Sequence, residues 1–251
     1  MGHPKKGLRI TTPRGILDPP KRAELLREVV CRGKKRKYYR FRYSRHYGGI
    51  VTADCVGCNL DCAFCWVNQP RKKPHLIGRF YSPEEVVERL MKISREKGIK
   101  RVRLSGGEPT LCKEHLLSLL SLIEEDIMFI LETNGTLIDE KLAEELSRFS
   151  NLHVRVSIKA CTPQKFKEVT NSTEDGFRMQ IKAIENLFRE KVSFHVSLVT
   201  HFCSEEEVIS LIHNLRRTFG VEVELERLEL YEHVLREISK RGLKLINPLG
   251  L

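Results

Sequence analysis

The chain has 251 residues, which is long enough for one α/β domain with a substantial core. No apolar stretch approaches the ~20 residues that a membrane-spanning helix needs, and the N-terminus lacks the apolar region of a signal peptide. We therefore expect a cytoplasmic protein that makes no contact with a membrane.

Positive charge is concentrated at the N-terminal end. Residues 1–45 contain 15 Lys and Arg but three acidic residues, a net charge of +12, whereas the net charge of the whole chain is +11. Such an asymmetry is typical of proteins that contact nucleic acid or another polyanion. We therefore divide the chain into a basic N-terminal extension, residues 1–45, and a nearly neutral core domain, residues 46–251.

The extension begins with a stretch rich in Pro and Gly, residues 1–20, which we expect to form an extended arm. Apolar residues at helical spacing predict a helix over residues 21–30. Aromatic and basic residues alternate over residues 38–43 and predict a strand, and a second strand over residues 50–53 leads into a loop rich in cysteine.

After this loop, predicted helices alternate with predicted strands. A helix over residues 83–97 begins after Ser82 and has acidic residues in its first turn, where the helix dipole favours them. Later strands are expected at residues 100–104, 127–131, 153–159, 193–200 and 221–227, and later helices at 114–125, 139–149, 163–169, 176–190, 204–219 and 231–241. Six strand–helix units predict an α/β fold in which a parallel sheet curls into an open, partial (β/α)6 barrel.

Three cysteines on one short loop carry the strongest chemical signal. Cys58, Cys62 and Cys65 lie in the run CNLDCAFC. Thiolates are the usual ligands of iron–sulfur clusters, and a [4Fe–4S] cluster normally takes four of them. Three ligands leave one iron open to another molecule, so we predict that these cysteines hold a reactive [4Fe–4S] cluster. The alternative is a structural zinc site with Cys55 as the fourth ligand, although we treat Cys55 as non-ligating.

The other four cysteines are scattered along the chain. We expect them to be reduced, buried and unpaired, as is usual in a reducing compartment. They are Cys31, Cys112, Cys161 and Cys203.

Two further motifs follow predicted strands. Gly106-Gly107-Glu108-Pro109 ends the second strand of the core and Thr133-Asn134-Gly135 ends the third. With the three cysteines and Phe64, they resemble the radical SAM superfamily, whose signature is Cys-x3-Cys-x-aromatic-Cys followed by Gly-Gly-Glu. The resemblance covers most of the chain and implies an oxidoreductase with a partial (β/α)6 barrel. Such an enzyme binds a [4Fe–4S] cluster and S-adenosyl-L-methionine (SAM), and takes electrons from a donor of the ferredoxin or flavodoxin type.

The same resemblance assigns the Gly-Gly-Glu motif to the cofactor. Gly106 and Gly107 would let the backbone approach the methionyl end, where a Cβ would clash. Glu108 would accept a hydrogen bond from the α-ammonium group. The alternative is an ordinary turn with a solvated Glu.

Four more candidates lie at later strand ends. Thr133 and Asn134 would contact the ribose or the methionyl group, and Ser157 and Lys159 would lie near the cofactor carboxylate, as in glycyl-radical activating enzymes. The alternatives are a turn that enters a helix and a lysine at the sheet edge. All of these residues fall at the carboxyl ends of predicted parallel strands, where such sheets place their sites.

Two residues are assigned more loosely. His201 follows the fifth strand and could reach the adenine, or it could simply be exposed. Trp66 follows the last cysteine and is expected either to shield the cluster or to pack in the core.

The substrate is left open between three interpretations. The extension interleaves Tyr38, Tyr39, Phe41 and Tyr43 with Arg40 and Arg42, a mixture suited to single-stranded RNA. The first interpretation is therefore radical modification of a macromolecule such as RNA or tRNA. The second is an activating enzyme that acts on a protein partner. The third is a non-enzymatic RNA-binding protein stabilised by zinc or a cluster.

Overall fold

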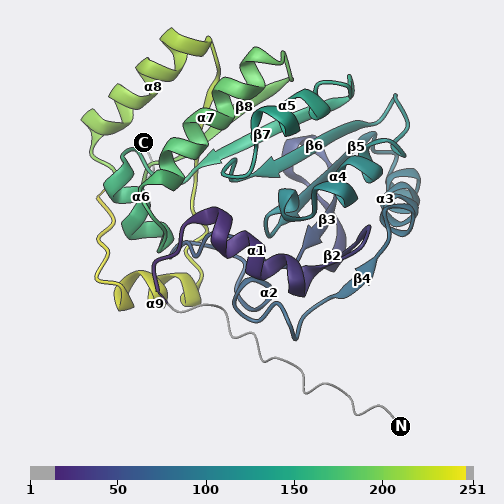
Figure 1. Cartoon of the computed structure of the whole chain (residues 1–251), viewed down its shortest axis with the longest axis horizontal. Helices are drawn as coiled ribbons and strands as arrows, with labels where there is room; N and C mark the ends of the chain where they lie inside the picture. Colours follow the sequence, from purple (N-terminus) through teal and green to yellow (C-terminus); the bar gives the residue numbers. More distant parts are fainter. Residues whose placement is uncertain (1–14, 247–251) are drawn as a thin grey trace.

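The computed structural model describes residues 15–246 and contains one mixed sheet of nine strands (Figure 1). The strands are β1 (Cys31–Arg32), β2 (Lys35–Ser44), β3 (Ile50–Cys55), β4 (Arg79–Tyr81), β5 (Arg101–Gly106), β6 (Met128–Thr133), β7 (Leu152–Ile158), β8 (Phe194–Val199) and β9 (Val223–Glu226). They lie in the order β1-β2-β3-β5-β6-β7-β8-β9, and β4 pairs with β2 outside this path.

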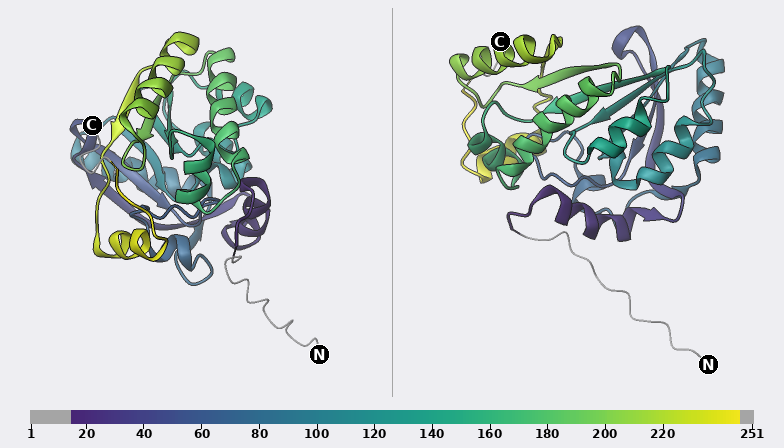
Figure 2. Two further views of the ribbon diagram at one scale, coloured as in Figure 1. Left: turned by 90° about the vertical axis from the view of Figure 1, so that its left-hand side faces the viewer. Right: turned by 45° about the horizontal axis from the view of Figure 1, so that its top comes forward.

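The part of the sheet from β3 to β9 is parallel, and β2 joins it antiparallel to β3. The sheet curls but does not close (Figure 2). The predicted α/β fold, an open partial barrel of six parallel strands, is therefore confirmed.

Helices connect the strands. The α-helices are α1 (Pro19–Val30), α2 (Gln69–Lys72), α3 (Pro83–Lys97), α4 (Lys113–Leu120), α5 (Glu140–Leu146), α6 (Pro163–Thr170), α7 (Asp175–Arg189), α8 (Glu205–Phe219) and α9 (Glu232–Lys240), and short 3-10 turns occur at η1 (His46–Gly48) and η2 (Pro109–Cys112). α3, α4, α5 and α7 lie side by side along the outer face of the sheet (Figures 1 and 2). Among the described residues, no helix is long and apolar enough to span a bilayer.

The local signals explain where several helices begin. Ser82 caps α3, which begins where it was predicted: the Ser82 hydroxyl accepts from the Glu85 N–H, and the Glu85 carboxylate accepts from the Ser82 N–H. α4 ends at Leu120, five residues before the predicted end, because residues 121–127 turn back into β6. The short strands β1 and β4 and the helix α2 were not predicted, because each is too short to show a period.

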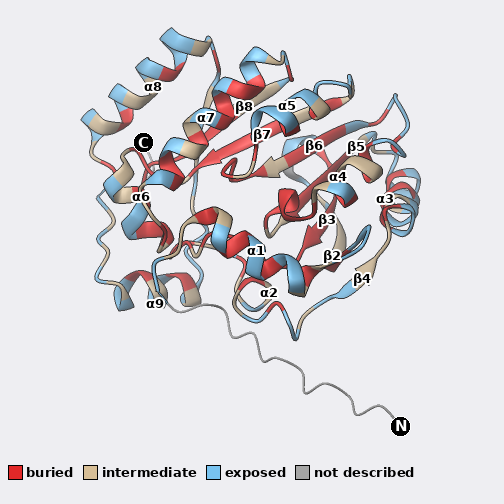
Figure 3. Ribbon diagram, in the orientation of Figure 1, coloured by how far each residue is buried: buried red, intermediate tan, exposed pale blue. Residues whose placement is uncertain are grey.

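The core lies between the sheet and the outer helices. Figure 3 shows the strands largely buried and the helices buried on one side only, as expected for amphipathic helices. A second, smaller apolar cluster joins α1 to the loops at the carboxyl ends of β3 and β5 through Leu26, Val56 and Leu111. α1 is thereby fixed beside the loops that carry the cysteines and the Gly-Gly-Glu motif.

Part of the predicted extension is built into the sheet. β2 pairs with β3 over most of its length, and the Tyr38 side chain is 1% exposed in the main core. Pro19 and Pro20, expected in the arm, begin α1. Residues 1–14 of the predicted arm lie outside the described residues, and residues 15–18 precede α1.

Candidate cofactor site

The cysteine loop follows β3 directly. Cys58, Cys62 and Cys65 carry free thiols, and all three line one cavity of about 140 Å³. The loop is held by its backbone, because the Asp61 and Ala63 N–H groups donate to carbonyls at the end of α6 at 3.0 and 2.8 Å. The structure therefore brings the predicted ligands together on one rigid loop.

Burial disfavours the thiolate form of these cysteines. Burial raises the pKa of Cys65 to about 12 and raises the pKa of Cys62 further, so both are protonated in the apo protein at neutral pH. Binding of a cluster must then displace these protons, because the thiolate is the ligand.

Cys55 is set apart from the other three cysteines of the loop. Among the described residues, no group of three or more His, Cys, Asp or Glu side chains is placed to hold one metal ion. Thiolates around a cluster stand farther apart, since each binds a different iron. Cys55 lies outside the cavity, fully buried, and its thiol donates to the Ser105 carbonyl at 3.2 Å. The residues present thus fit a three-cysteine cluster better than the four-cysteine zinc alternative.

Gly106 and Gly107 let two loops of the site approach each other. Gly106 has φ +90°, and a Cβ on Gly107 would lie 2.0 Å from the Gly57 carbonyl oxygen. This close approach lets the Gly107 and Glu108 N–H groups donate to the carbonyls of Cys55 and Gly57, both at 2.8 Å. In the structure these glycines therefore pack the Gly-Gly-Glu loop against the cysteine loop. Their predicted approach to the cofactor stays a prediction.

Glu108 lines the cavity, yet its carboxylate is already occupied. One oxygen accepts from the Thr110 N–H and hydroxyl and from the Thr133 hydroxyl, and the other accepts from the Asn134 N–H at 2.8 Å. The side chain is 1% exposed. Glu108 thus ties the loop after β5 to the loop after β6, in addition to any contact it makes with a ligand.

Asn134 extends this network to the cysteine loop. Its side-chain Nδ2 donates to Oδ1 of Asn59 at 2.9 Å and lies 3.7 Å from the Cys58 sulfur. Its side-chain Oδ1 accepts from the backbone N–H and the hydroxyl of Thr136. We call residues 56–68, 106–112 and 133–138 the near wall of the cavity, and the Glu108, Thr133 and Asn134 side chains connect its three segments.

The opposite side of the cavity is built differently. Lys159 donates to the Ser157 hydroxyl at 2.6 Å, and Ser157 donates to Glu226 at 2.7 Å. Arg155 lies 3.6 Å from the same carboxylate and also pairs with Glu224. We call Arg155, Ser157, Lys159 and Glu226 the far wall.

Two cations of the far wall favour the ionised form of Glu226. Burial opposes ionisation of Glu226, but Lys159 and Arg155 outweigh this and hold its pKa below the usual range. Ser157 and Lys159 were predicted at this site from the sequence, whereas Arg155 and Glu226 were not. Both residues lie in strands where polar and apolar residues alternate. A strand with one face in solvent shows this alternation, and so does a strand whose charged side chains face into an open barrel.

His201 is not on the cavity wall. It is 1% exposed, its Nε2 accepts weakly from the Leu228 N–H at 3.5 Å, and its Nδ1 is buried without a partner among the described residues. Burial lowers its pKa, so the imidazole is neutral at pH 7. Leu228, which does line the cavity, is the residue that His201 contacts.

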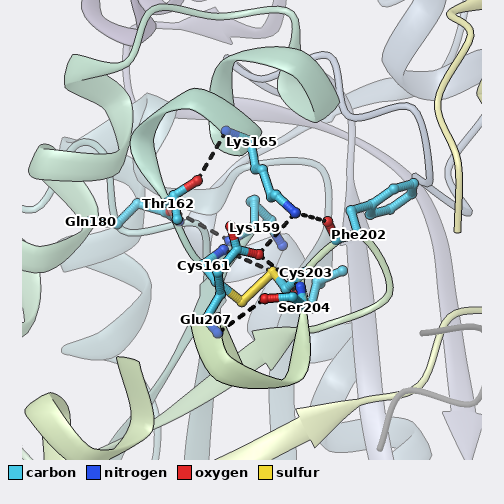
Figure 4. Close-up of a disulfide and its surroundings, with 10 residues drawn as sticks. Lys159, Cys161, Thr162, Lys165, Gln180, Phe202, Cys203, Ser204 and Glu207 are labelled. Atoms are coloured by element: carbon cyan, nitrogen blue, oxygen red, sulfur yellow. Dashed lines mark hydrogen bonds and ion pairs between the residues drawn. A yellow bond between two sulfur atoms is a disulfide. The ribbon is translucent and has the colours of Figure 1, made fainter. Parts of the chain in front are cut away.

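The expectation of four reduced, unpaired cysteines is wrong. Cys31 pairs with Cys112, and Cys161 pairs with Cys203 (Figure 4). The second disulfide joins the loops after β7 and β8. Lys165 of α6 forms a further link nearby, because it donates to the Phe202 carbonyl and pairs with Glu207 of α8, both at 2.8 Å. These pairings were missed because they join residues 81 and 42 positions apart, which spacing alone does not reveal.

A larger cavity of about 850 Å³ adjoins the first. Trp66 lines both cavities and is 36% exposed, so it packs neither wholly in the core nor wholly over the site. The Arg40 guanidinium lies 5.6 Å from the Trp66 ring centre, and Arg40 and Arg42 share one oxygen of the buried Asp54. This larger cavity is therefore lined by aromatic and charged side chains.

The aromatic run predicted to stack on RNA is divided between two environments. Tyr38 is buried, and Phe41 packs edge-on against Tyr81 with 5.2 Å between ring centres. Tyr39 lines the larger cavity, while Tyr43 is exposed. The run therefore does not present one continuous stacking surface.

Comparison with known proteins agrees with this geometry. A family model described as "Radical SAM superfamily" matches residues 54–215. A probable GTP 3',8-cyclase from Pyrococcus abyssi is 33% identical over 176 residues, which is 68% of this chain and 54% of that protein. The GTP 3',8-cyclase of Aquifex aeolicus is 30% identical over 161 residues, 61% of this chain and 48% of that protein. The chain thus spans about half the length of the curated relatives it matches.

Solved structures show the same fold. The crystal structure of Streptococcus suis SuiB bound to S-adenosylmethionine has a TM-score of 0.56, with 21% identity over 75% of this chain and 47% of that chain. SuiB bound to its precursor peptide SuiA has a TM-score of 0.57, with 21% identity over 78% of this chain and 47% of that chain.

Proposed function

Because this chain belongs to the radical SAM superfamily, we propose that it cleaves SAM reductively and abstracts a hydrogen atom from a substrate bound beside the cofactor. The family uses a [4Fe–4S] cluster and SAM. When bound, the cluster supplies one electron to the sulfonium of SAM, which yields the 5'-deoxyadenosyl radical.

One observation carries the proposal. The cysteines on the loop after β3 and the predicted cofactor residues after β5, β6 and β7 all line one cavity. Those residues are Cys58, Cys62, Cys65, Gly106, Gly107, Glu108, Thr133, Asn134, Ser157 and Lys159. Unrelated motifs on four different strands would not converge in this way.

The chain's own residues divide the work. Cys58, Cys62 and Cys65 would hold the cluster, and the near wall would keep their loop in place. On the far wall, the ammonium group of Lys159 suits the cofactor carboxylate, because hydrogen bonds between charged groups are about twice as strong as neutral ones. Trp66 and Phe64 limit the access of water to the cysteines.

The test is anaerobic reconstitution followed by reduction. The wild-type protein should bind about four irons, and with dithionite and SAM it should release 5'-deoxyadenosine and methionine. Cys58→Ala, Cys62→Ala and Cys65→Ala should each abolish the cluster, while Cys55→Ala should keep it. Zinc in place of iron, or a loaded protein that never cleaves SAM, would contradict the proposal.

We propose the larger cavity as the substrate site, since it adjoins the cofactor cavity and shares Trp66, Arg155 and Glu226 with it. An RNA substrate, the first interpretation from the sequence, is supported only by the charge of the N-terminal residues. Deletion of residues 1–14 removes Lys5, Lys6, Arg9 and Arg14 but no described element.

The deletion therefore gives a clean test of RNA binding. If RNA is bound there, the truncated protein should still cleave SAM but bind tRNA more weakly. Full-length binding should fall steeply with salt, each single-strand phosphate adding about −0.7 to the slope of log K against log salt. If the full-length protein does not bind tRNA at low salt, this result would favour the second interpretation, a protein partner.

A further inference from the structure

A second cavity reaches Cys58 from the side of α1. It has a volume of about 480 Å³ and is lined by residues of α1, α2, α9 and the cysteine loop. Cys58 and Arg71 line both this rear cavity and the cofactor cavity. The cysteine loop therefore lies between two cavities and lines both of them.

Arg22 is the unusual residue of the rear cavity. It belongs to α1, and its side chain is 1% exposed. Its Nη2 donates to the carbonyls of Gly15 and Asn171 at 3.2 and 3.1 Å. Its Nε and Nη1 are buried without a hydrogen-bond partner, and it has no ion pair with any described residue.

The other arginines of this cavity have carboxylate partners. Arg71 pairs with Asp61, and Arg241 pairs with both Asp61 and Glu237 at 2.9 Å. Within residues 15–246, Arg22 is thus a buried guanidinium in this cavity whose charge no carboxylate neutralises. A buried, unpaired charge costs several kcal/mol, so a compensating negative group is expected nearby.

The cysteine loop supplies that negative group. Cys58 lines the rear cavity together with the buried Arg22, so a thiolate at this position shares the same enclosed space as the guanidinium. The thiolate and not the thiol is the ligand of a cluster, so the loop becomes negative when it binds iron. A free anion in the rear cavity would be repelled by the same thiolates.

We propose that Arg22 is a positioning residue for the cluster, whose uncompensated guanidinium behind Cys58 stabilises the negative charge that the cluster gains on reduction. The proposal rests on the proposed function. Charge and hydrogen bonds near the sulfurs are among the factors that set the potential of such clusters. In the absence of this positive charge, the same one-electron reduction becomes harder.

The test measures the midpoint potential of the reconstituted cluster by an EPR-monitored titration without SAM. Arg22→Met and Arg22→Gln should lower the equilibrium constant for one-electron reduction at least tenfold, which corresponds to 59 mV. Arg22→Lys keeps the charge and should remain within about threefold of the wild type, a shift that the same constant makes smaller than 30 mV.

Arg27→Met is the matched control. Arg27 lies on the same helix and also donates to a backbone carbonyl, that of Leu111 at 2.9 Å, but it is exposed and lines none of the three cavities described. It should leave the potential unchanged. If Arg22→Met and Arg22→Gln fail to hold iron while Arg22→Lys succeeds, the need for the charge is supported.

Three results would overturn the inference. The first is an unchanged potential in Arg22→Met and Arg22→Gln. The second is a shift as large in Arg22→Lys or Arg27→Met, and the third is loss of iron from every Arg22 variant including Lys, since shape and not charge would then decide. A wild-type protein that binds no cluster would instead refute the proposed function, so the two failures are distinguishable.

Discussion

The near and far walls of the cofactor cavity are both polar, but they satisfy their polar groups in different ways. On the near wall, Glu108, Thr133 and Asn134 bond to one another and to the cysteine loop. On the far wall, Arg155 and Glu226 line the cavity but pair with each other, while Lys159 has a hydroxyl partner and no carboxylate partner among the described residues. A closed network of this kind fixes geometry, whereas the Lys159 ammonium is available to a ligand. Changes on the near wall should therefore mainly cost stability, and changes on the far wall should mainly cost affinity.

The largest effect on stability is expected for Glu108→Ala. It leaves the Thr133 hydroxyl and the N–H groups of Thr110 and Asn134 without their acceptor, and each buried unsatisfied group costs about 1–3 kcal/mol. We expect a loss of about 3 kcal/mol or more in the free energy of unfolding, measured by urea denaturation. Thr110→Val removes one donor and should cost less. If Glu108→Ala is as stable as the wild type, the hydrogen-bond network of the near wall does not stabilise the protein.

The disulfide between Cys161 and Cys203 should come next. Cys161→Ser with Cys203→Ser opens a cross-link between residues 42 apart, and loss of such a link typically costs about 2–4 kcal/mol. Urea denaturation without reductant measures the effect. The pair Cys31→Ser and Cys112→Ser, which opens the other link, serves as the comparison. If reductant leaves the stability of the wild-type protein unchanged, the cross-links do not form in solution.

Lys159→Met tests whether the far wall contributes to cofactor affinity. Lys159 is half-buried and its described hydrogen-bond partner is the Ser157 hydroxyl. Its removal leaves Glu226 with two hydroxyl donors, Ser157 and Ser197. We expect SAM affinity to fall by about 1.5–3 kcal/mol, the usual value for a hydrogen bond to a charged group. Isothermal titration with SAM measures this, and the loss of stability of the apo protein should be smaller than for Glu108→Ala, because Lys159 favours the ionised form of Glu226 but Arg155 remains beside it. A large loss of stability with intact affinity would assign Lys159 to the scaffold instead.

The smallest effect concerns Glu237 on α9, which pairs with Lys72 and Arg241 at 2.8 and 2.9 Å. Burial raises its pKa, but these cations outweigh burial and lower it to about 2. Because the pKa is depressed in the folded state, the stabilisation is complete above the ordinary value near 4.3 and is lost as the pH falls towards 2. Glu237→Gln should therefore cost about 1 kcal/mol at pH 7, and the difference should vanish near pH 2. A difference in urea midpoint that persists at low pH would contradict this assignment.

The sequence predicted the fold and one side of the site well, for a physical reason. Strands and outer helices carry periodic apolar residues, and in parallel sheets the loops at the carboxyl ends of the strands share one edge, so Cys58, Gly106, Asn134 and Lys159 could be placed together in advance. Arg22, Glu226 and the two disulfides could not be placed. Each depends on a contact between distant segments, and a buried arginine on a basic helix has the same sequence pattern as an exposed one.

The order of the strands in the sheet has a consequence for how the protein is made. From β3 to β9, strands joined in the parallel sheet also follow one another along the chain, apart from the short β4. Each unit can therefore dock on the unit synthesised just before it, without waiting for a partner that is synthesised much later. The cysteine loop leaves the ribosome early, whereas Lys159 and Glu226 arrive late. During synthesis, the ligands of the cluster are thus in place before the wall that faces them.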